Sequence, residues 1–268
     1  MSDRSLGAEG IYLSVQDLAC GYGKGSRVVH GVSLKANPGA ITAIVGPNGA
    51  GKSTVLKAIM GELNAVQGKI MVGANDVTKL AIYQRVSAGL GYVPQLKAVF
   101  PRLSVKENLE MGAYSLPASK RPDSLDAAFE RFPIFASKAH QRAGTLSGGE
   151  QRLLGIARAW VVGPKVLLLD EPTAALSPKA TSEVWEELLA LKGEGVVLVI
   201  VEQRTKQTLQ VADWVYVMTS GKNAIDGSPK DLQDNYDLGE IFMGGSPTTR
   251  NGSVGVGQAL GMSEGSES

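Results

Sequence analysis

The sequence predicts an α/β fold in which a parallel sheet is covered by helices on both faces. Three observations lead to this prediction. Short apolar runs occur at Ile41–Val45, Val166–Leu169 and Val196–Val201, the pattern of strands buried on both faces. Helical segments lie between these runs, and such alternation is typical of parallel sheets. The chain has 268 residues and is 43% hydrophobic, which is enough for one large domain or for two small ones that share a core.

The N-terminal third of the chain alternates between strands and turns around one helix. Ile11–Val15 alternates apolar and polar residues as a half-buried strand does. Ile41–Val45 is an apolar strand that leads into a glycine-rich turn, and Ser53–Met60 has the character of a helix. Leu80–Leu90 is predicted as a second helix that ends before Gly91.

The middle of the chain is predicted to be helical, and residues 93–160 are expected to form an inserted subdomain. Its predicted helices are Val105–Tyr114, Ser124–Phe132 and Glu150–Trp160. Beyond it, Val166–Leu169 is a buried strand, Thr181–Leu191 an amphipathic helix and Val196–Val201 a second buried strand. No helix or strand is predicted after Val201.

The two ends of the chain differ from the rest in composition. Residues 245–268 contain few large apolar side chains and many Gly and Ser, so they cannot bury enough surface to offset their ordering entropy. We therefore expect a disordered tail at 245–268 and a flexible N-terminus at 1–10. One domain is expected to occupy residues 11–244.

The composition excludes several classes of protein. Lys and Arg total 27 and Asp and Glu total 26, for a net charge of +1, which argues against a dedicated nucleic-acid binder. The single cysteine, Cys20, can form no internal disulfide and is expected to be a small buried residue. No apolar run reaches the ~18–20 residues that span a bilayer, and the N-terminus lacks the apolar region of a signal peptide. We expect a cytosolic protein that reaches a membrane only through another protein.

The strongest functional signal is the motif GPNGAGKST at 46–54. It fits G-x-x-x-x-G-K-[ST] between a predicted strand and a predicted helix, which is the context that this phosphate-binding motif requires. Its glycines let backbone N–H groups point at phosphate oxygens, and the helix that follows directs its positive dipole end at the same charge. Lys52 is expected to reach the β- and γ-phosphates, and the Ser53 hydroxyl to bind Mg²⁺. The predicted nucleotide-binding residues here are Gly46, Pro47, Asn48, Gly49, Ala50, Gly51, Lys52, Ser53 and Thr54. The alternative, a glycine-rich turn with a chance lysine, does not account for the flanking strand and helix.

A second signal is the pair of acids, Asp170 and Glu171, that ends an apolar strand. An unpaired carboxylate beside apolar surface is unfavourable, so a cation is expected nearby. Ligands of parallel sheets lie at the carboxyl ends of the strands. We expect Asp170 to face the metal, directly or through water, and Glu171 to orient and deprotonate the attacking water. The alternative is a helix N-terminus that favours acids.

The motif LSGGEQR at 146–152 lies between these two and opens the helix that runs to Trp160. The three motifs together resemble the ATP-binding-cassette (ABC) ATPases over about residues 10–244. The resemblance implies the P-loop ABC ATPase fold, with a mainly parallel core sheet, an N-terminal antiparallel β subdomain and an inserted helical subdomain. It also implies ATP and Mg²⁺ as cofactors and a dimer in which Ser147, Gly148 and Gly149 cap the γ-phosphate of ATP bound to the opposite subunit. A serine and N–H groups at a helix start suit such an anion site.

Two further residues match positions of this family. Gln95 matches the loop glutamine that joins the two subdomains and senses Mg²⁺ and the γ-phosphate, which makes Ser53, Gln95 and Asp170 the expected metal site. Taken alone, a Gln after Pro is more often a solvated turn residue. Tyr22 matches the aromatic residue that stacks on adenine, although a Tyr between glycines is equally compatible with packing in a turn.

Two positions depart from the family pattern. Gln203 stands where the family usually has a histidine that contacts the γ-phosphate, and Gln can donate a hydrogen bond but cannot become cationic. Ser177 stands where an aspartate is usual, which implies a weaker polar contact across the dimer. The two histidines, His30 and His140, lie outside the motifs and are expected at the surface or in turns.

Three segments resemble one branch of the family, the LivF-like ATPases of branched-chain amino-acid uptake and their urea and amide relatives. They are Val201–Gln203, Val99–Leu109 and Gln141–Thr145. The resemblance implies an importer subunit that works with a second ABC ATPase subunit in a homo- or heterodimer, with two transmembrane permease subunits, and indirectly with a solute-binding protein. Such subunits are peripheral to the cytoplasmic face of the inner (plasma) membrane.

The sequence does not decide between an exposed and a buried position for Leu96, Val99 and Phe100. These residues follow the loop glutamine and either form an apolar notch for a short permease helix or pack internally. Two other functions remain as alternatives: the ATPase of an ABC exporter of lipid or lipopolysaccharide type, and a soluble non-transport ABC ATPase. No nucleic-acid partner is expected.

Overall fold

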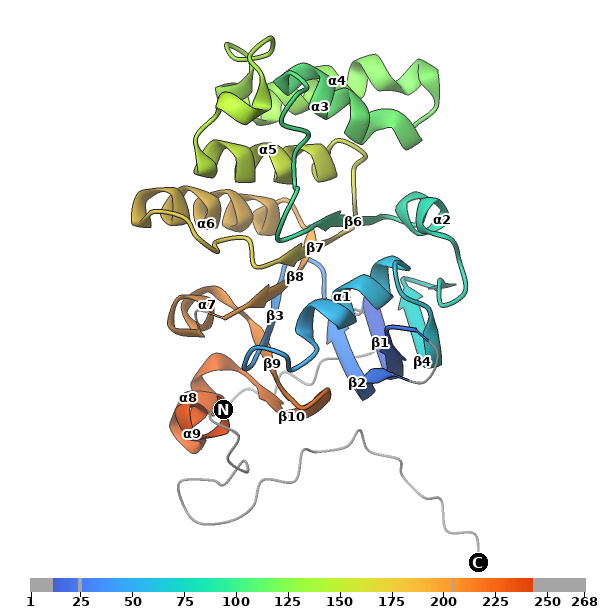
Figure 1. Cartoon of the computed structure of the whole chain (residues 1–268), viewed down its shortest axis with the longest axis vertical. Coiled ribbons are helices and arrows are strands. Elements are labelled where there is room, and N and C mark those ends of the chain that lie inside the picture. The colour runs from blue at the N-terminus through green and yellow to red at the C-terminus, as the bar shows by residue number, and fades with distance from the viewer. Residues whose placement is uncertain (1–11, 24–25, 204, 243–268) are drawn as a thin grey trace, which may run out of the picture.

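A six-stranded sheet forms the centre of the computed structural model, which describes residues 12–23, 26–203 and 205–242. Its strand order is β10-β9-β3-β8-β7-β6 (Figure 1). All neighbours pair in parallel except the edge strand β10, which is antiparallel to β9. The strands are β3 (Ile41–Val45), β6 (Leu90–Val93), β7 (Val166–Asp170), β8 (Val197–Glu202), β9 (Trp214–Thr219) and β10 (Lys222–Gly227).

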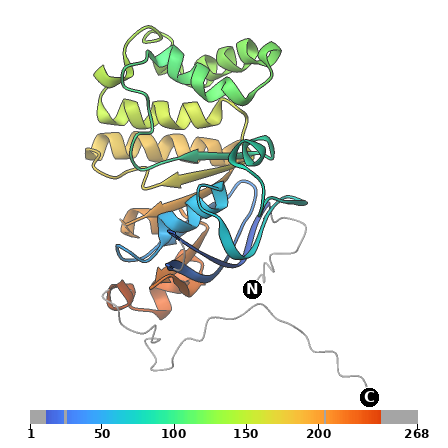
Figure 2. The ribbon, with the colours of Figure 1, turned by 45° about the vertical axis from the view of Figure 1, so that its right-hand side comes forward.

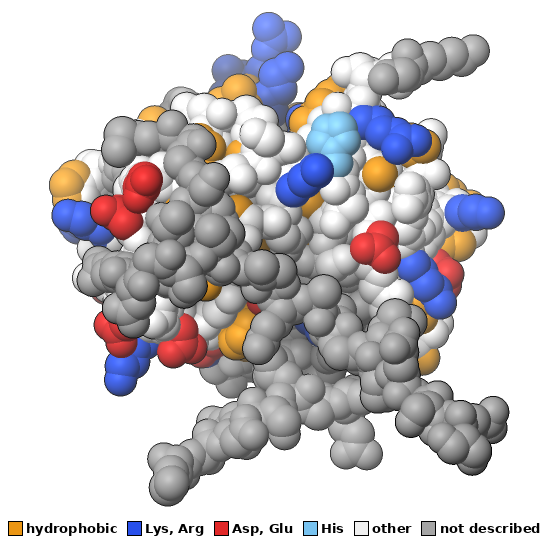
Figure 3. All heavy atoms as spheres, turned by 90° about the horizontal axis from the view of Figure 1, so that it is seen from below, with side chains coloured by type: hydrophobic (Ala, Val, Ile, Leu, Met, Phe, Trp, Pro, Cys, Tyr) orange, Lys and Arg blue, Asp and Glu red, His pale blue; other side chains and the backbone are white. Residues whose placement is uncertain are grey.

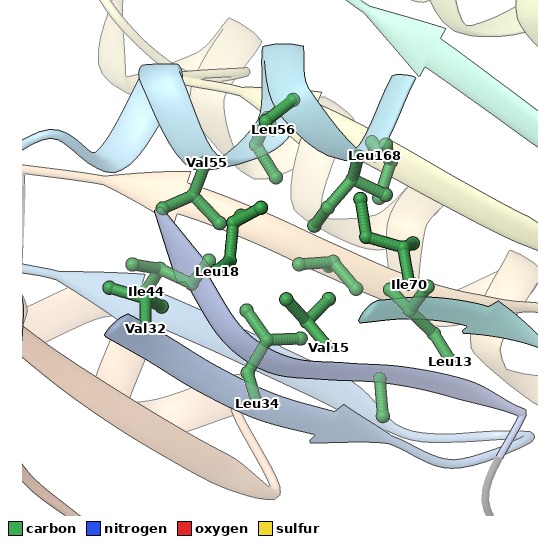
Figure 4. Packing of buried hydrophobic residues seen from close by; sticks show 14 of the residues in the cluster. Leu13, Val15, Leu18, Val32, Leu34, Ile44, Val55, Leu56, Ile70 and Leu168 are labelled. Carbon is green, nitrogen blue, oxygen red and sulfur yellow. The ribbon is translucent and has the colours of Figure 1, made fainter. Parts of the chain in front are cut away.

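An antiparallel sheet of order β2-β1-β4-β5 stands beside the central sheet. Its strands are β1 (Leu13–Gly21), β2 (Arg27–Ala36), β4 (Ala65–Val72) and β5 (Asn75–Asp76). The helix α1 (Lys52–Met60) lies between the two sheets, and one hydrophobic cluster joins all three (Figure 4). Val55 and Leu56 of α1 meet Leu18 of β1 and Leu168 of β7 in this cluster, and each is fully buried. Burial of a leucine or valine side chain contributes roughly 1.5–3 kcal/mol, so this cluster fixes the position of the helix that follows the phosphate loop.

The other face of the central sheet is covered by helices. Because side chains alternate along a strand, Leu168 faces α1 while Leu167 and Leu169 face the opposite cluster, which contains α5 (Gly148–Trp160) and α6 (Pro178–Gly193). Figures 1 and 2 show α6 against the sheet, α5 above it, and α3 (Val105–Gly112) and α4 (Arg121–Arg131) as the outermost layer. The helices α7 (Thr205–Val211), α8 (Pro229–Asn235) and α9 (Leu238–Phe242) cover the same face beside β3 and β9. The segment between β6 and β7 thus supplies α3, α4 and α5, the outer helices on this face.

The remaining elements are short. They are α2 (Ile82–Ser87) and the 3₁₀ turns η2 (Ala113–Ser115), η3 (Ala118–Lys120), η4 (Pro133–Phe135) and η5 (Ala143–Thr145).

Most predicted elements are present, and the α/β fold class is confirmed. The helix predicted at Leu80–Leu90 is wrong at its C-terminal end, because Leu90 begins strand β6. The reason lies in Gly91: a Cβ there would approach the Leu167 Cδ1 atom to 3.0 Å, so a glycine lets β6 lie close to its neighbour. Strands β2, β4, β5, β6, β9 and β10 were not predicted. The predicted flexible N-terminus at 1–10 and the disordered tail at 245–268 lie outside the described residues, as does Ile11 of the first predicted strand.

Several expectations about single residues are confirmed. Cys20 is fully buried in β1, and burial raises its pKa to about 11. His30, on β2, and His140, in a turn, are both exposed. Acidic and basic side chains are interspersed on the described part of the face shown in Figure 3. Within residues 12–23, 26–203 and 205–242, no helix is both long enough and apolar enough to span a bilayer.

Candidate functional site

The glycine-rich loop connects β3 to α1 and depends on its glycines for its shape. Gly46 has φ +150°, and a Cβ at this position would lie 2.1 Å from the Met218 carbonyl oxygen of β9. Gly51, the N-cap of α1, has φ +95°. The loop is also anchored from outside, since the Gly221 N–H donates to the Ala50 carbonyl at 3.0 Å. These contacts fix the loop against the turn between β9 and β10.

The inner side of the loop presents hydrogen-bond donors. The backbone N–H groups of Gly49, Gly51, Lys52 and Ser53 donate to no acceptor among the described residues. The Lys52 ammonium, only 5% exposed, donates to the carbonyl oxygens of Gly46 at 2.8 Å and Pro47 at 2.9 Å. Burial lowers its pKa, while the nearby carboxylates of Glu171 and Asp170 oppose this shift. Free N–H groups at a helix N-terminus beside a lysine make a site for phosphate groups.

The Ser53 hydroxyl and the Asp170 carboxylate meet at the carboxyl ends of the central strands. Ser53 Oγ donates to Asp170 Oδ1 at 2.7 Å, and the Tyr92 hydroxyl lies 3.5 Å from Asp170 Oδ2. Asp170 is 3% exposed, and burial raises its pKa. Among the described residues, no lysine or arginine forms an ion pair with it. A buried carboxylate beside a hydroxyl, with no cationic partner, fits the oxygen ligands that Mg²⁺ takes together with phosphates.

Glu171 is held by two glutamine side chains. The Gln95 amide donates to Glu171 Oε2 at 2.7 Å, and the Gln203 amide donates to Oε1 at 2.6 Å. Glu171 is 7% exposed and has φ +46°, a left-handed conformation that is strained for a residue with a side chain. Its N–H donates to the Val201 carbonyl at 2.9 Å, which extends the pairing of β7 and β8. The Glu171 carboxylate is therefore fixed at the carboxyl end of β7.

The structure brings together six of the predicted residues: Lys52, Ser53, Gln95, Asp170, Glu171 and Gln203. Gln95 contacts Glu171 and not the pair formed by Ser53 and Asp170. Tyr22 stands apart: it is 49% exposed, with the Lys57 ammonium 5.9 Å from its ring centre.

The LSGGEQR motif forms the start of α5. Ser147 is the N-cap, and its hydroxyl accepts from the Glu150 N–H at 3.3 Å while the Glu150 carboxylate accepts from the Ser147 N–H at 2.9 Å. The two hydrogen bonds form a capping box, and Lys138 pairs with Glu150 from outside. Ser147 and Gly148 are exposed, whereas Gly149 is buried where a Cβ would lie 2.7 Å from the Ala180 Cβ. None of the described contacts joins this helix start to the phosphate loop of the same chain.

Four residues near the site were not assigned a role from the sequence. Tyr92 contacts Asp170; Arg152, Thr173 and Glu202 form hydrogen bonds around Glu171. The sequence held a signal for one of these four residues, because Glu202 ends the apolar strand β8 just as Asp170 ends β7. Ser177 also has a role that was not predicted, as the N-cap of α6 that accepts from the Ala180 N–H at 3.3 Å.

Comparison with known proteins agrees with this geometry. The family model described as "ABC transporter" matches residues 29–174. The chain is 36% identical to the probable branched-chain amino acid transport ATP-binding protein LivF of Archaeoglobus fulgidus, over 85% of this chain and 96% of the relative. It is also 36% identical to the high-affinity branched-chain amino acid transport ATP-binding protein BraG of Pseudomonas aeruginosa, over 87% of this chain and all of the relative.

An export protein and a solved structure are similar as well. The lipopolysaccharide export system ATP-binding protein LptB of Haemophilus influenzae is 34% identical over 87% of this chain and 97% of its own length. A crystal structure of the ADP conformation of an ATP-binding cassette of an ABC transporter superposes with a TM-score of 0.78 at 27% identity, covering 87% of this chain and 99% of the other.

Proposed function

Because the chain belongs to the ABC transporter family of ATP-binding subunits, which bind and hydrolyse ATP, we propose that it powers the uptake of branched-chain amino acids or of a related small polar solute. The observation that carries this proposal is the 36% identity to two branched-chain amino acid transport ATP-binding proteins, which extends over 96% and 100% of their lengths. Likeness along the whole chain favours a shared role over a shared motif.

The loop at 46–54 binds the nucleotide. Its free N–H groups hold the phosphates, Lys52 reaches the β- and γ-phosphates, and Tyr22 stacks on adenine. Ser53 and Asp170 would hold Mg²⁺, with Gln95 of the adjoining loop as the third expected ligand, and the metal would supply positive charge to the phosphates. The buried carboxylate of Asp170 and its hydrogen bond to Ser53 support this assignment.

Hydrolysis uses Glu171 as the group that orients and deprotonates water. A positioned base contributes about 10²–10⁴ in rate. Gln203 contacts the γ-phosphate as a neutral amide donor, so no imidazolium takes part at this position. The two hydrogen bonds from Gln95 and Gln203 to Glu171 support a shared role of these three side chains.

The working unit is a dimer of ABC ATPase subunits, paired with itself or with a second type of subunit. Ser147, Gly148 and Gly149 of one subunit cap the ATP held by the other, and the exposure of Ser147 and Gly148 supports this role. Two permease subunits bind the dimer at the cytoplasmic face of the plasma membrane, and a solute-binding protein delivers the solute. Leu96, 74% exposed, and Val99 line one hollow, and Phe100, 42% exposed, follows Val99 in the chain; together they form the notch for a permease helix.

The second candidate is the ATPase of an exporter of lipid or lipopolysaccharide, which the 34% identity to LptB favours.

Uptake assays separate the importer from the exporter. Deletion of the gene is expected to abolish high-affinity uptake of labelled leucine, isoleucine or valine, or of a related amide, and the intact gene is expected to restore it. The Lys52→Ala variant serves as the inactive control. Normal uptake of all these solutes, together with a loss of exported lipid or lipopolysaccharide, would overturn the importer proposal.

A further inference from the structure

Arg152 joins the helix of the LSGGEQR motif to the loop that carries Gln95. Its guanidinium donates to the Pro94 carbonyl at 3.1 Å and to the Gln95 carbonyl at 3.0 Å. The residue is only 9% exposed, and burial lowers its pKa. It forms no ion pair with any of the described acids. A cation that is buried against neutral carbonyl groups is unfavourable, which points to a task other than stability.

Glu202 occupies the matching position on the other side of Glu171. It is 2% exposed at the end of β8, and its Oε1 atom accepts from the Thr173 N–H at 3.0 Å and from the Thr173 hydroxyl at 2.7 Å. Its Oε2 atom accepts from the Gln203 N–H at 3.2 Å. Thr173 lies two residues after Glu171, so this one carboxylate holds both the loop that follows Glu171 and the backbone of Gln203.

Each of the two buried charges therefore holds the backbone of one of the glutamines that contact Glu171. Arg152 fixes the backbone of Gln95, Glu202 fixes the backbone of Gln203, and the amides of these two glutamines hold the two oxygens of Glu171. The opposite charges of Arg152 and Glu202 also attract each other through the protein interior. Among the described residues, neither forms a hydrogen bond with the phosphate loop, although the Glu202 carboxylate opposes through space the lowering of the Lys52 pKa that burial causes.

We propose that Arg152 and Glu202 are positioning residues for hydrolysis, which act by holding Gln95 and Gln203 where their amides fix the Glu171 carboxylate. This inference rests on the role proposed above for Glu171. Because Arg152 lies on the helix whose first residues are the exposed LSGGEQR start, it also links the dimer-facing surface of a subunit to that subunit's own Glu171. A displacement of about 1 Å at a reacting group can lower a rate by about 10²-fold. Loss of the hydrogen bonds of Arg152 or of Glu202 is therefore expected to lower kcat measurably.

The test compares turnover and nucleotide binding in Arg152→Met, Arg152→Lys and Glu202→Gln. For Arg152→Met and Glu202→Gln, kcat is expected to fall about 10- to 100-fold, while the Kd for MgATP stays within about twofold of wild type. Glu202→Gln puts an amide NH₂ where an acceptor is needed. Arg152→Lys, which keeps the charge and one donor group, is expected to recover part of the loss.

Double variants test whether Arg152 and Glu202 act through Glu171, because their losses in kcat would then not add to the loss from Glu171→Gln. Placed in the Glu171→Gln background, Arg152→Met and Glu202→Gln are expected to cause little further loss, because residues that act as a unit are not additive. A full additional loss there would overturn the proposal, as would a fall in ATP affinity by the same factor as the fall in kcat/KM.

The matched controls are Arg131→Met and Glu187→Gln. These two side chains form a 2.7 Å ion pair between α4 and α6, away from the nucleotide site, and their loss is expected to lower the Tm while kcat is unchanged. Wild-type turnover in Arg152→Met and Glu202→Gln, with Glu171→Gln inactive, would refute the positioning role alone. Wild-type turnover in Glu171→Gln would refute the proposed mechanism itself.

Discussion

Glu171 combines two features that rarely occur together in a residue with only a structural role. Its backbone has a left-handed φ of +46°, and its two carboxylate oxygens are each held by a glutamine amide. Two of the other residues with positive φ, Lys97 and Ala175, flank the same site. Strain of about 1–3 kcal/mol per residue persists only where the surrounding structure enforces it, and its concentration here marks the site as functional.

Replacement of Glu171 by Gln should separate binding from hydrolysis. The substitution removes the base and turns one of the two amide contacts into a donor facing a donor, so kcat is expected to fall about 10²- to 10⁴-fold. ATP binding should persist because the phosphate loop is untouched. Steady-state turnover and the Kd for MgATP measure the two effects, with Glu187→Gln on α6 as the control. Turnover near wild type in the Glu171→Gln variant would remove Glu171 as the base.

The sequence predicts the components of the site better than their contacts. Lys52, Ser53, Asp170 and Glu171 belong to motifs whose residue types and spacing carry the chemistry. The contacts of Glu171 do not follow from spacing, because Gln95 lies 76 residues before it and Gln203 lies 32 residues after it. Only the order β8-β7-β6 of the folded sheet brings the three together.

At the scale of elements, α3 meets α5 at a glycine. A Cβ at Gly112 would lie 2.3 Å from the Arg158 carbonyl oxygen and 2.8 Å from the Val161 Cγ1 atom. Backbone oxygen cannot move aside as a flexible side chain does, so the close approach of the two helices depends on the missing side chain. Gly193, at the end of α6, has no atom within 4 Å of such a Cβ.

Gly112→Ala and Gly193→Ala should therefore have opposite effects on stability. We expect Gly112→Ala to destabilise the protein by about 1–3 kcal/mol through overpacking. Gly193→Ala should be neutral or stabilise it by up to about 1 kcal/mol, because alanine favours the helix. Urea unfolding curves measure both free energies. Equal stability of the two variants would show that α3 and α5 can separate without cost.

The elements differ in how far the sequence predicts them, and the reasons are physical. The strands β3, β7 and β8 are evident because both of their faces are buried and nearly all of their residues are apolar. β6 has four residues and includes Gly91, so it is too short for a periodic pattern. β10 is an edge strand with three charged or amide side chains in six residues, which resembles a turn. β9, by contrast, has the same apolar character as β8 and was predictable by the same criterion.

At the scale of the whole molecule, the two places proposed to bind one nucleotide lie apart. The phosphate loop faces the carboxyl ends of the strands, while Ser147 and Gly148 are exposed at the start of α5 and make no contact with that loop. In the dimer proposed above, a nucleotide enclosed by both would need a second subunit. ATP would then be part of the dimer interface.

Mixing two inactive variants tests the composite site. Lys52→Ala removes the phosphate contact, and Gly148→Asp places a negative charge at the cap, where a Cβ has ordinary space at 3.7 Å from Leu176. Each variant alone should be inactive. In a 1:1 mixture half of the dimers are mixed and carry one intact site each, so about one quarter of the wild-type rate is expected. A mixture with no turnover would contradict a site shared between copies of this chain.

The enclosure of α1 between two sheets has a consequence for how the molecule moves. The helix that carries Lys52 and Ser53 shares one close-packed interior with both sheets, and such interiors resist deformation. A nucleotide-dependent shift of the phosphate loop is therefore expected to carry both sheets with it as one unit.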